Sequence, residues 1–171
     1  MQKLFFAAIL AASTTAVAQT PAADWSAWNR LIGEWIASDP LPGGATGGTT
    51  FALELQGRVL VRKNFADYGK GKPRHEDLIV MYQDGATTRA DYWDNEGHVI
   101  HYVATVEEGG RRFRFLSDAG PGPHYRLTYD VEGVHRTSGV TKQIFVTFEF
   151  APPDSPDAWR PYILRAGLYR K

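Results

Sequence analysis

The chain has 171 residues, of which 19 are basic and 19 acidic, so it carries no formal net charge at pH 7. A neutral chain without blocks of like charge offers no electrostatic footprint for nucleic acid or for an anionic membrane. It contains no cysteine, which excludes disulfides and a thiol nucleophile. The aromatic content of 13% argues for a folded domain rather than a disordered chain.

The first residues have the pattern of an export signal. Lys3 supplies a positive charge, Leu4–Ala12 is an apolar run too short to span a bilayer, and Ala16-Val17-Ala18 fits the small-x-small cleavage pattern. We therefore expect residues 1–18 to be a signal peptide and residues 19–171 to form one domain, which would be periplasmic or extracellular. The alternative is an N-terminal anchor that is not cleaved.

One short helix is predicted near the start of the mature chain. Asp24 is a plausible N-cap, and Trp25, Trp28 and Ile32 fall at helical spacing, so they would share one apolar face. A lid that packs against one end of the β-structure is the expected role of this helix.

After Trp35 the chain shows only strand signals, separated by turns such as Asp84-Gly85 and Asp94–Gly97. Asp39–Gly48 is predicted as a loop. No segment resembles a crossover helix, so the strands should be antiparallel, in a sandwich or in a single up-and-down β-barrel of about 8–10 strands. The expected strands are Phe51–Leu55, Arg58–Tyr68, His75–Gln83, Thr87–Trp93, His98–Val106, Arg111–Leu116, Tyr125–Tyr129, Val134–Ser138, Gln143–Phe150 and Tyr162–Tyr169.

The run Leu31-Ile32-Gly33-Glu34-Trp35, the glycine-rich loop after it, and a last strand with Arg165 and Arg170 resemble the lipocalin-like (calycin) superfamily. In that superfamily a Trp of the first strand packs under an Arg of the last strand and closes the barrel. The resemblance therefore implies a closing role for Gly33 and Trp35, with Arg165 or Arg170 as the partner. Such a cation–π contact contributes about 0.5–2 kcal/mol.

The same start also resembles nitrobindins, ten-stranded barrels that bind haem through a His near the C-terminus. Here the last strand, Tyr162–Tyr169, has no histidine, and the final histidine is His135. Haem is therefore not expected, and no other cofactor is predicted. The segments Leu55–Arg62 and Asp94–Ile100 are similar to uncharacterised secreted bacterial domains of the lipocalin-like kind, a resemblance that implies no known activity.

Complete catalytic and metal-binding motifs are missing from the sequence. No Gly-x-Ser-x-Gly elbow is present, and Gly43–Thr50 is not a phosphate loop because Thr49 stands where its lysine should be. His98 and His101 are three residues apart on a strand, so they face opposite ways and cannot share a metal. His75 and Asp77 do share a face but make at most half of a metal site. No metal is predicted.

Polar residues at strand positions are the remaining candidates for a site. Side chains two residues apart share a face of a strand, and one of the two faces of a barrel wall lines the lumen. If that is the polar face, the lumen holds a hydrogen-bonding ligand site with aromatic walls; if not, the same side chains lie in solvent. The candidate ligand-binding residues are Arg62, Asn64, Asp77, Tyr92, His98 and Tyr102.

Three functions are compatible with these features. The first is an exported barrel that binds a small, partly apolar molecule. The second is an enzyme that uses His98 or His75 as a general base and an Arg as an anion clamp. The third is a filled barrel that makes contacts through rim residues such as Trp25, Trp28 and Trp159. The sequence sets neither the ligand nor the oligomeric state.

Overall fold

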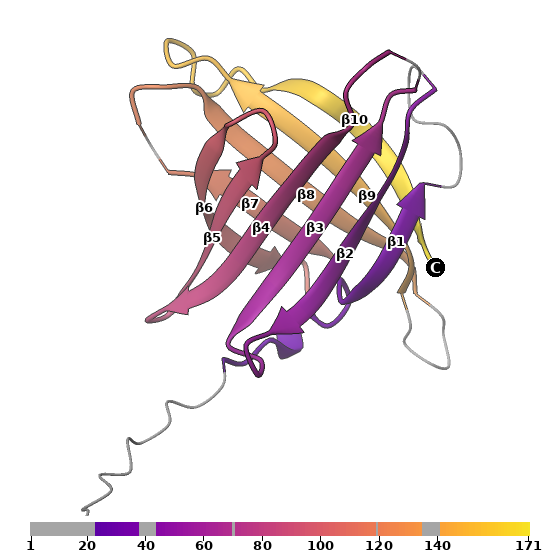
Figure 1. The fold of residues 1–171 in the computed structure, drawn as a ribbon. Coiled ribbons are helices and arrows are strands. Elements are labelled where there is room, and N and C mark those ends of the chain that lie inside the picture. The colour runs from indigo at the N-terminus through magenta and orange to yellow at the C-terminus, as the bar shows by residue number, and fades with distance from the viewer. Residues whose placement is uncertain (1–22, 38–43, 70, 119, 135–140) are drawn as a thin grey trace, which may run out of the picture.

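The computed structural model describes residues 23–37, 44–69, 71–118, 120–134 and 141–171. They form ten antiparallel strands that pair in chain order, and β1 pairs with β10 to close the barrel (Figure 1). The prediction of a single antiparallel up-and-down barrel is confirmed. The strands are β1 (Gly33–Ala37), β2 (Thr46–Glu54), β3 (Val59–Asp67), β4 (His75–Asp84), β5 (Thr87–Asp94), β6 (Val99–Glu107), β7 (Arg112–Ser117), β8 (His124–Val134), β9 (Thr141–Ala151) and β10 (Arg160–Arg170).

The expected N-terminal helix is only a single 3-10 turn, η1 (Ser26–Trp28). Asp24 accepts a hydrogen bond from the Ser26 amide (2.9 Å), and the chain soon enters β1 at Gly33. Too few residues separate the turn from the strand for a longer helix to form. Within the part of the chain described, no helix has both the length and the apolar character needed to span a bilayer.

β1 is not among the predicted strand ranges, and the largest differences in strand boundaries lie in β2 and β8. Thr46–Gly48, expected in a loop, begin β2, where Gly48 lies between Ile36 of β1 and Phe65 of β3. Val134, expected to start a separate strand, is the last residue of β8. The rest of that predicted strand, the final His135, and the predicted signal peptide lie outside the described residues.

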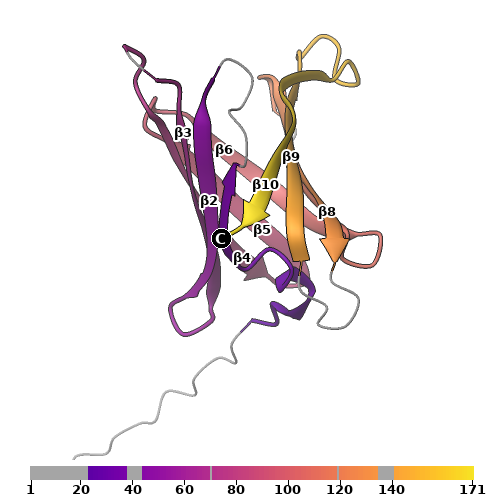
Figure 2. The same cartoon turned by 90° about the vertical axis from the view of Figure 1, so that its right-hand side faces the viewer.

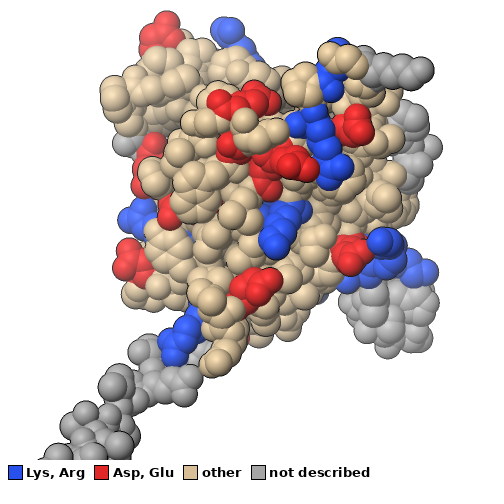
Figure 3. Space-filling view, viewed as in Figure 1, with Lys and Arg blue, Asp and Glu red and all other residues tan. Residues whose placement is uncertain are grey.

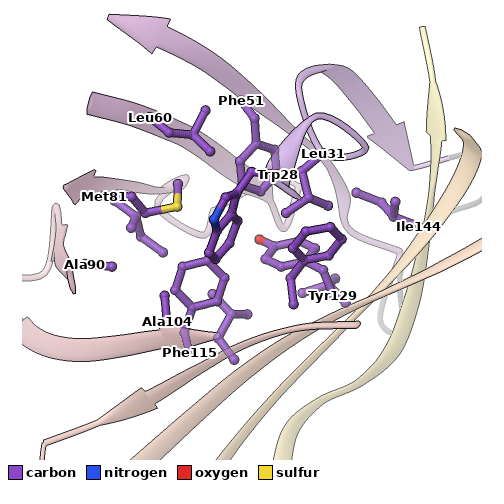
Figure 4. Close-up of a cluster of buried hydrophobic side chains, with 14 of the residues drawn as sticks. Trp28, Leu31, Phe51, Leu60, Met81, Ala90, Ala104, Phe115, Tyr129 and Ile144 are labelled. Carbon is purple, nitrogen blue, oxygen red and sulfur yellow. The ribbon is translucent and has the colours of Figure 1, made fainter. Parts of the chain in front are cut away.

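The η1 segment fills one end of the barrel, which we call the closed end (Figures 1 and 2). Trp25 donates a hydrogen bond to the Gly57 carbonyl in the β2–β3 turn (2.9 Å). Trp28 packs on Phe113 and Phe115, with its ring centre 5.3 and 5.8 Å from theirs. Figure 4 shows Trp28 beside Phe115. Burying one large apolar side chain contributes about 1.5–3 kcal/mol, so this plug is a main source of stability.

Arg170 closes the seam between the first and last strands. Its guanidinium carbon lies 4.3 Å from the centre of the Trp35 ring. It also donates to the main-chain carbonyls of Thr141 (2.8 Å), Ile32 (2.8 Å) and Arg30 (3.3 Å). Of the two arginines expected as the partner of Trp35, this position is therefore held by Arg170.

Gly33 makes room for that guanidinium. A β-carbon at residue 33 would lie 2.3 Å from Arg170 Nη1, and its backbone has φ +132°, a conformation that favours glycine. Arg165 lies elsewhere on β10, 3.7 Å from the centre of the Phe145 ring and paired with Glu132. It follows that Gly33, Trp35 and Arg170 form the closure.

The first half of β10 pairs irregularly with β9. The register shifts between Pro161 and Ile163 and again between Ile163 and Ala166, and Arg165 has φ +43°. From Ala166 to Tyr169 the pairing is regular. The irregular half lies at the end of the barrel opposite η1, where the even-numbered strands begin, and we call this the distal end.

Candidate ligand site at the distal end

Three adjacent strands direct polar side chains into the distal half of the barrel. Asn64 of β3 is the register partner of Asp77 of β4, and Asp77 is the partner of Asp94 of β5. Arg62 lies two residues before Asn64, on the same inward face as the fully buried Leu60. Strand alternation and register thus gather side chains that are 13 to 15 residues apart in the chain.

The centre of this distal cluster is the ion pair of Arg62 and Asp77, which are 5% and 9% exposed. Arg62 Nη1 donates to Asp77 Oδ1, and Asn64 Nδ2 donates to Asp77 Oδ2 (2.7 Å). Burial raises the pKa of Asp77, but Arg62, His75 and Asn64 outweigh it and keep the pKa below its ordinary value. Asp77 is therefore ionised at neutral pH and neutralises most of the charge of Arg62.

His75 joins the cluster through both of its ring nitrogens. Nε2 lies 3.2 Å from Asp77 Oδ2, and Nδ1 lies 3.0 Å from Glu96 Oε1. The hydrogen bond to Asp77, with help from Glu96, overcomes partial burial and raises the pKa of His75 to about 9. The ring is consequently a cation at neutral pH, with both of its N–H groups directed at carboxylates.

Asp94 connects two more of the predicted site residues. It accepts a hydrogen bond from the Tyr92 hydroxyl (3.0 Å) and lies 2.7 Å from His98 Nδ1. The structure thus places Arg62, Asn64, Asp77 and Tyr92 in one network that includes His75. His98 reaches this network only through Asp94, and its side chain is 62% exposed.

Tyr102, the sixth predicted residue, lies deeper in the barrel, with its ring centre 6.1 Å from that of Phe115. Burial raises the pKa of its hydroxyl, so it stays protonated. Among the described residues five buried side-chain polar atoms have no hydrogen-bond partner: this hydroxyl, Arg62 Nε, the Tyr129 hydroxyl, Arg114 Nε and Thr141 Oγ1. A buried polar atom without a partner costs about 1–3 kcal/mol, so the atoms of Arg62, Tyr102 and Tyr129, which face the barrel interior, have unused capacity to bind.

An aromatic row stands on the opposite wall of the distal end. The rings of Tyr125 and Phe148 stack at 5.9 Å with 13° between their planes, and Phe148 stacks on Tyr162 at 5.7 Å. Tyr162 is 64% exposed although its ring belongs to this row. The distal end therefore has a charged, hydrogen-bonding wall from β3–β5 and an aromatic wall from β8–β10.

Several contributors were not among the predicted ligand-binding residues, although the sequence indicates His75 as a candidate general base and as half of a metal site. His75 shares a face with Asp77, a signal visible in the sequence, but Glu96 belongs to a turn and nothing in its position indicates that it lies beside His75. Phe148 and Tyr162 carry no signal beyond ordinary strand alternation. No described residues form a group of three or more His, Asp or Glu side chains with a geometry that could hold a metal ion.

Comparison with known proteins leaves the family open: no family model matches the chain, and no curated protein is similar to it. The closed ten-stranded barrel itself is consistent with a calycin-like fold.

Proposed function

We propose that the chain is an exported, calycin-like barrel that binds a small, partly apolar molecule at its distal end. The observation that carries this proposal is a set of unpartnered polar atoms inside the barrel, Arg62 Nε and the hydroxyls of Tyr102 and Tyr129, in a barrel whose opposite wall at the distal end is a half-exposed aromatic row. Binding sites for small molecules are commonly apolar pockets with a few polar groups that fix orientation.

The charges of the distal cluster narrow the chemistry of the ligand. Arg62 is paired with Asp77, and His75 lies between Asp77 and Glu96, so among the described residues neither cation of the distal cluster is left free to hold an anionic group. The ligand should therefore be uncharged, with an aromatic or aliphatic body for the Tyr125–Phe148–Tyr162 row and a hydroxyl or amide for Tyr102. No resident cofactor is needed in this scheme.

The catalytic alternative has less support from the geometry. A general base must be unprotonated, but the carboxylates on both sides of His75 keep its ring charged at neutral pH. An anion clamp must be a free cation, but Arg62 is paired with Asp77. His98 is largely exposed to solvent.

The proposal is tested with N-phenyl-1-naphthylamine, an uncharged aromatic probe that fluoresces in apolar surroundings. We expect the wild-type protein to bind it and Phe148→Ala to weaken binding, because the central ring of the row is lost. Leu116→Ala, a change of an exposed side chain on β7, is the matched control. Circular dichroism checks that both variants fold. No binding by the wild type, or equal binding by Phe148→Ala, would refute the distal site.

A second measurement addresses the polar wall. 4-Phenylphenol, which adds a hydroxyl to a biphenyl body, should displace the probe, and Tyr102→Phe should weaken this competition while leaving the probe itself bound. Tyr169→Phe, on the outer side of β10, is the control for loss of a tyrosine hydroxyl. Unchanged competition in Tyr102→Phe would show that the buried hydroxyl does not contact the ligand.

A further inference from the structure

A hollow lies on the outer surface of the barrel, across β1–β5. Its volume is about 690 Å³, within the range of small-molecule sites. Its outward lining residues follow the strand register: Glu34, Thr50, Lys63, Leu78 and Trp93 are successive cross-strand neighbours. They alternate with Asn64 and Asp77, whose side chains enter the distal cluster, so this outer groove is on the other side of the same wall.

A buried glycine at the floor of the outer groove is covered by an aromatic ring. Gly48 lies between Ile36 and Phe65 in the register, and a β-carbon there would approach the Trp35 carbonyl oxygen to 2.9 Å and the Phe65 ring to 3.0 Å. The position therefore excludes a side chain. Ile36 on one side and Trp93 on the other remain substantially exposed and supply apolar walls.

The charged side chains around the outer groove form ion pairs, except for Lys63. Arg74 pairs with Glu76 (3.0 Å), and Lys171 pairs with Glu34 (3.1 Å). The ammonium of Lys63 has no ion pair or side-chain hydrogen bond to any residue that the structure describes, although it stands in the middle of the row. Its register neighbours, Thr50 and Leu78, carry no charge. Figure 3, which shows this side of the molecule, has blue and red atoms scattered among uncharged ones, with no large patch of either sign.

We infer that the outer groove is a second binding site, which takes an amphipathic organic monoanion. Lys63 and the Thr50 hydroxyl would hold a carboxylate or sulfonate, and the apolar body would lie against Ile36, Phe65 or Trp93. A single free cation suits one negative charge, whereas phosphate groups are usually held by several cations or backbone amides. The ligand class thus differs from the uncharged molecule proposed for the distal end.

The test uses 1-anilinonaphthalene-8-sulfonate, which has the ring system of N-phenyl-1-naphthylamine with one added sulfonate. Isothermal titration calorimetry should show binding, and Lys63→Gln should weaken it about tenfold, as expected for the loss of one charge-assisted contact. Lys142→Gln, a change of an exposed lysine on β9, should leave the affinity unchanged. Added salt should weaken the wild type more than Lys63→Gln.

Different results of these experiments would refute the outer groove and the distal site. If Phe148→Ala rather than Lys63→Gln removes the anionic probe, the probe sits at the distal end, and the outer groove is refuted while the distal site stands. If both lysine variants bind like the wild type, the outer groove is refuted as well. Binding of the uncharged probe should not change in Lys63→Gln; a loss there would show that both probes use the outer groove and would overturn the distal proposal.

Discussion

Arg170 lies across the ring of Trp35 at 4.3 Å while it donates hydrogen bonds to three main-chain carbonyls. Two of those carbonyls, of Arg30 and Ile32, belong to the segment that leads from η1 into β1, and the third belongs to β9. The Arg170 side chain therefore connects β10 to Trp35 of β1, to β9, and to the segment between η1 and β1.

Arg170→Ala should lower the free energy of unfolding by about 2–4 kcal/mol, because a cation–π contact and several charged hydrogen bonds are lost together. Arg170→Lys should restore only part of this, since an ammonium cannot reproduce the planar fork. Arg165→Ala, which removes an exposed ion pair and an exposed cation–π contact with Phe145 but no main-chain hydrogen bonds, is the control and should change stability by about 1 kcal/mol. Urea unfolding measures all three, and equal effects of Arg165→Ala and Arg170→Ala would contradict the assigned closure.

Gly33→Ala should also destabilise the protein, by about 1–3 kcal/mol from the backbone conformation alone and further from the close approach to Arg170. In the double variant Gly33→Ala/Arg170→Ala the close approach disappears but the backbone strain remains. The combined loss should therefore be smaller than the two single losses added together. Strict additivity in thermal or urea unfolding would mean that the two residues do not interact.

Asp77→Asn should cost about 3–5 kcal/mol, because it leaves the guanidinium of Arg62 buried without its counter-charge. Replacing both partners, as Arg62→Met/Asp77→Leu, should recover much of the stability, since the guanidinium and the carboxylate are then both absent. Asp118→Asn, which breaks the exposed pair with Arg89, should cost no more than about 1 kcal/mol. A double variant less stable than Asp77→Asn would show that the pair is needed for folding.

The protein should lose stability as the pH rises from 7 to 10. The folded pKa of His75, about 9, is above the ordinary 6.5, so its contribution is complete below about pH 6.5 and is lost as the pH passes 9. The upper bound on this loss is about 3 kcal/mol. His75→Gln should remove this part of the alkaline loss, and an identical pH profile in urea unfolding would contradict the assignment.

The opposite dependence is expected at low pH. The folded pKa of Asp77 is below 3.8, so its stabilisation is present above that value and is lost as the pH falls through the folded pKa. Acid unfolding of Arg62→Met/Asp77→Leu should therefore be shallower than that of the wild type. A steeper acid transition in the double variant would mean that other carboxylates dominate.

The all-β class and the antiparallel order could be predicted because they depend on local signals, strand alternation and turn residues. Which side chains of β3 face the barrel interior could not be predicted from the sequence. Its outward set, with Val61 and Phe65, is more apolar than its inward set, with Arg62 and Asn64, so hydrophobic patterning alone favours the wrong face. Which face of β3 lies inside depends on neighbouring residues of β4, because Asp77 neutralises the buried charge of Arg62.

Contacts between residues far apart in the chain could not be predicted from the sequence either. Both Arg165 and Arg170 are on the last strand, and only the register of β1 on β10, which sets Trp35 against residue 170, chooses between them. Glu96 meets His75 because the turn after β5 folds back over the start of β4. Pairings of this kind depend on how strands align, which a single sequence leaves undetermined.

The packing of the closed end also determines what tryptophan fluorescence can measure in this protein. Three of the five tryptophans, Trp25, Trp28 and Trp35, are sealed there with at most 3% of their surface exposed, away from the distal end. Their emission should change when the closed end unfolds and should stay constant when a ligand binds at the distal end. Emission from these three tryptophans is thus a measure of unfolding, whereas ligand binding has to be followed by the signal of the ligand or by Trp93 and Trp159, which lie outside the closed end.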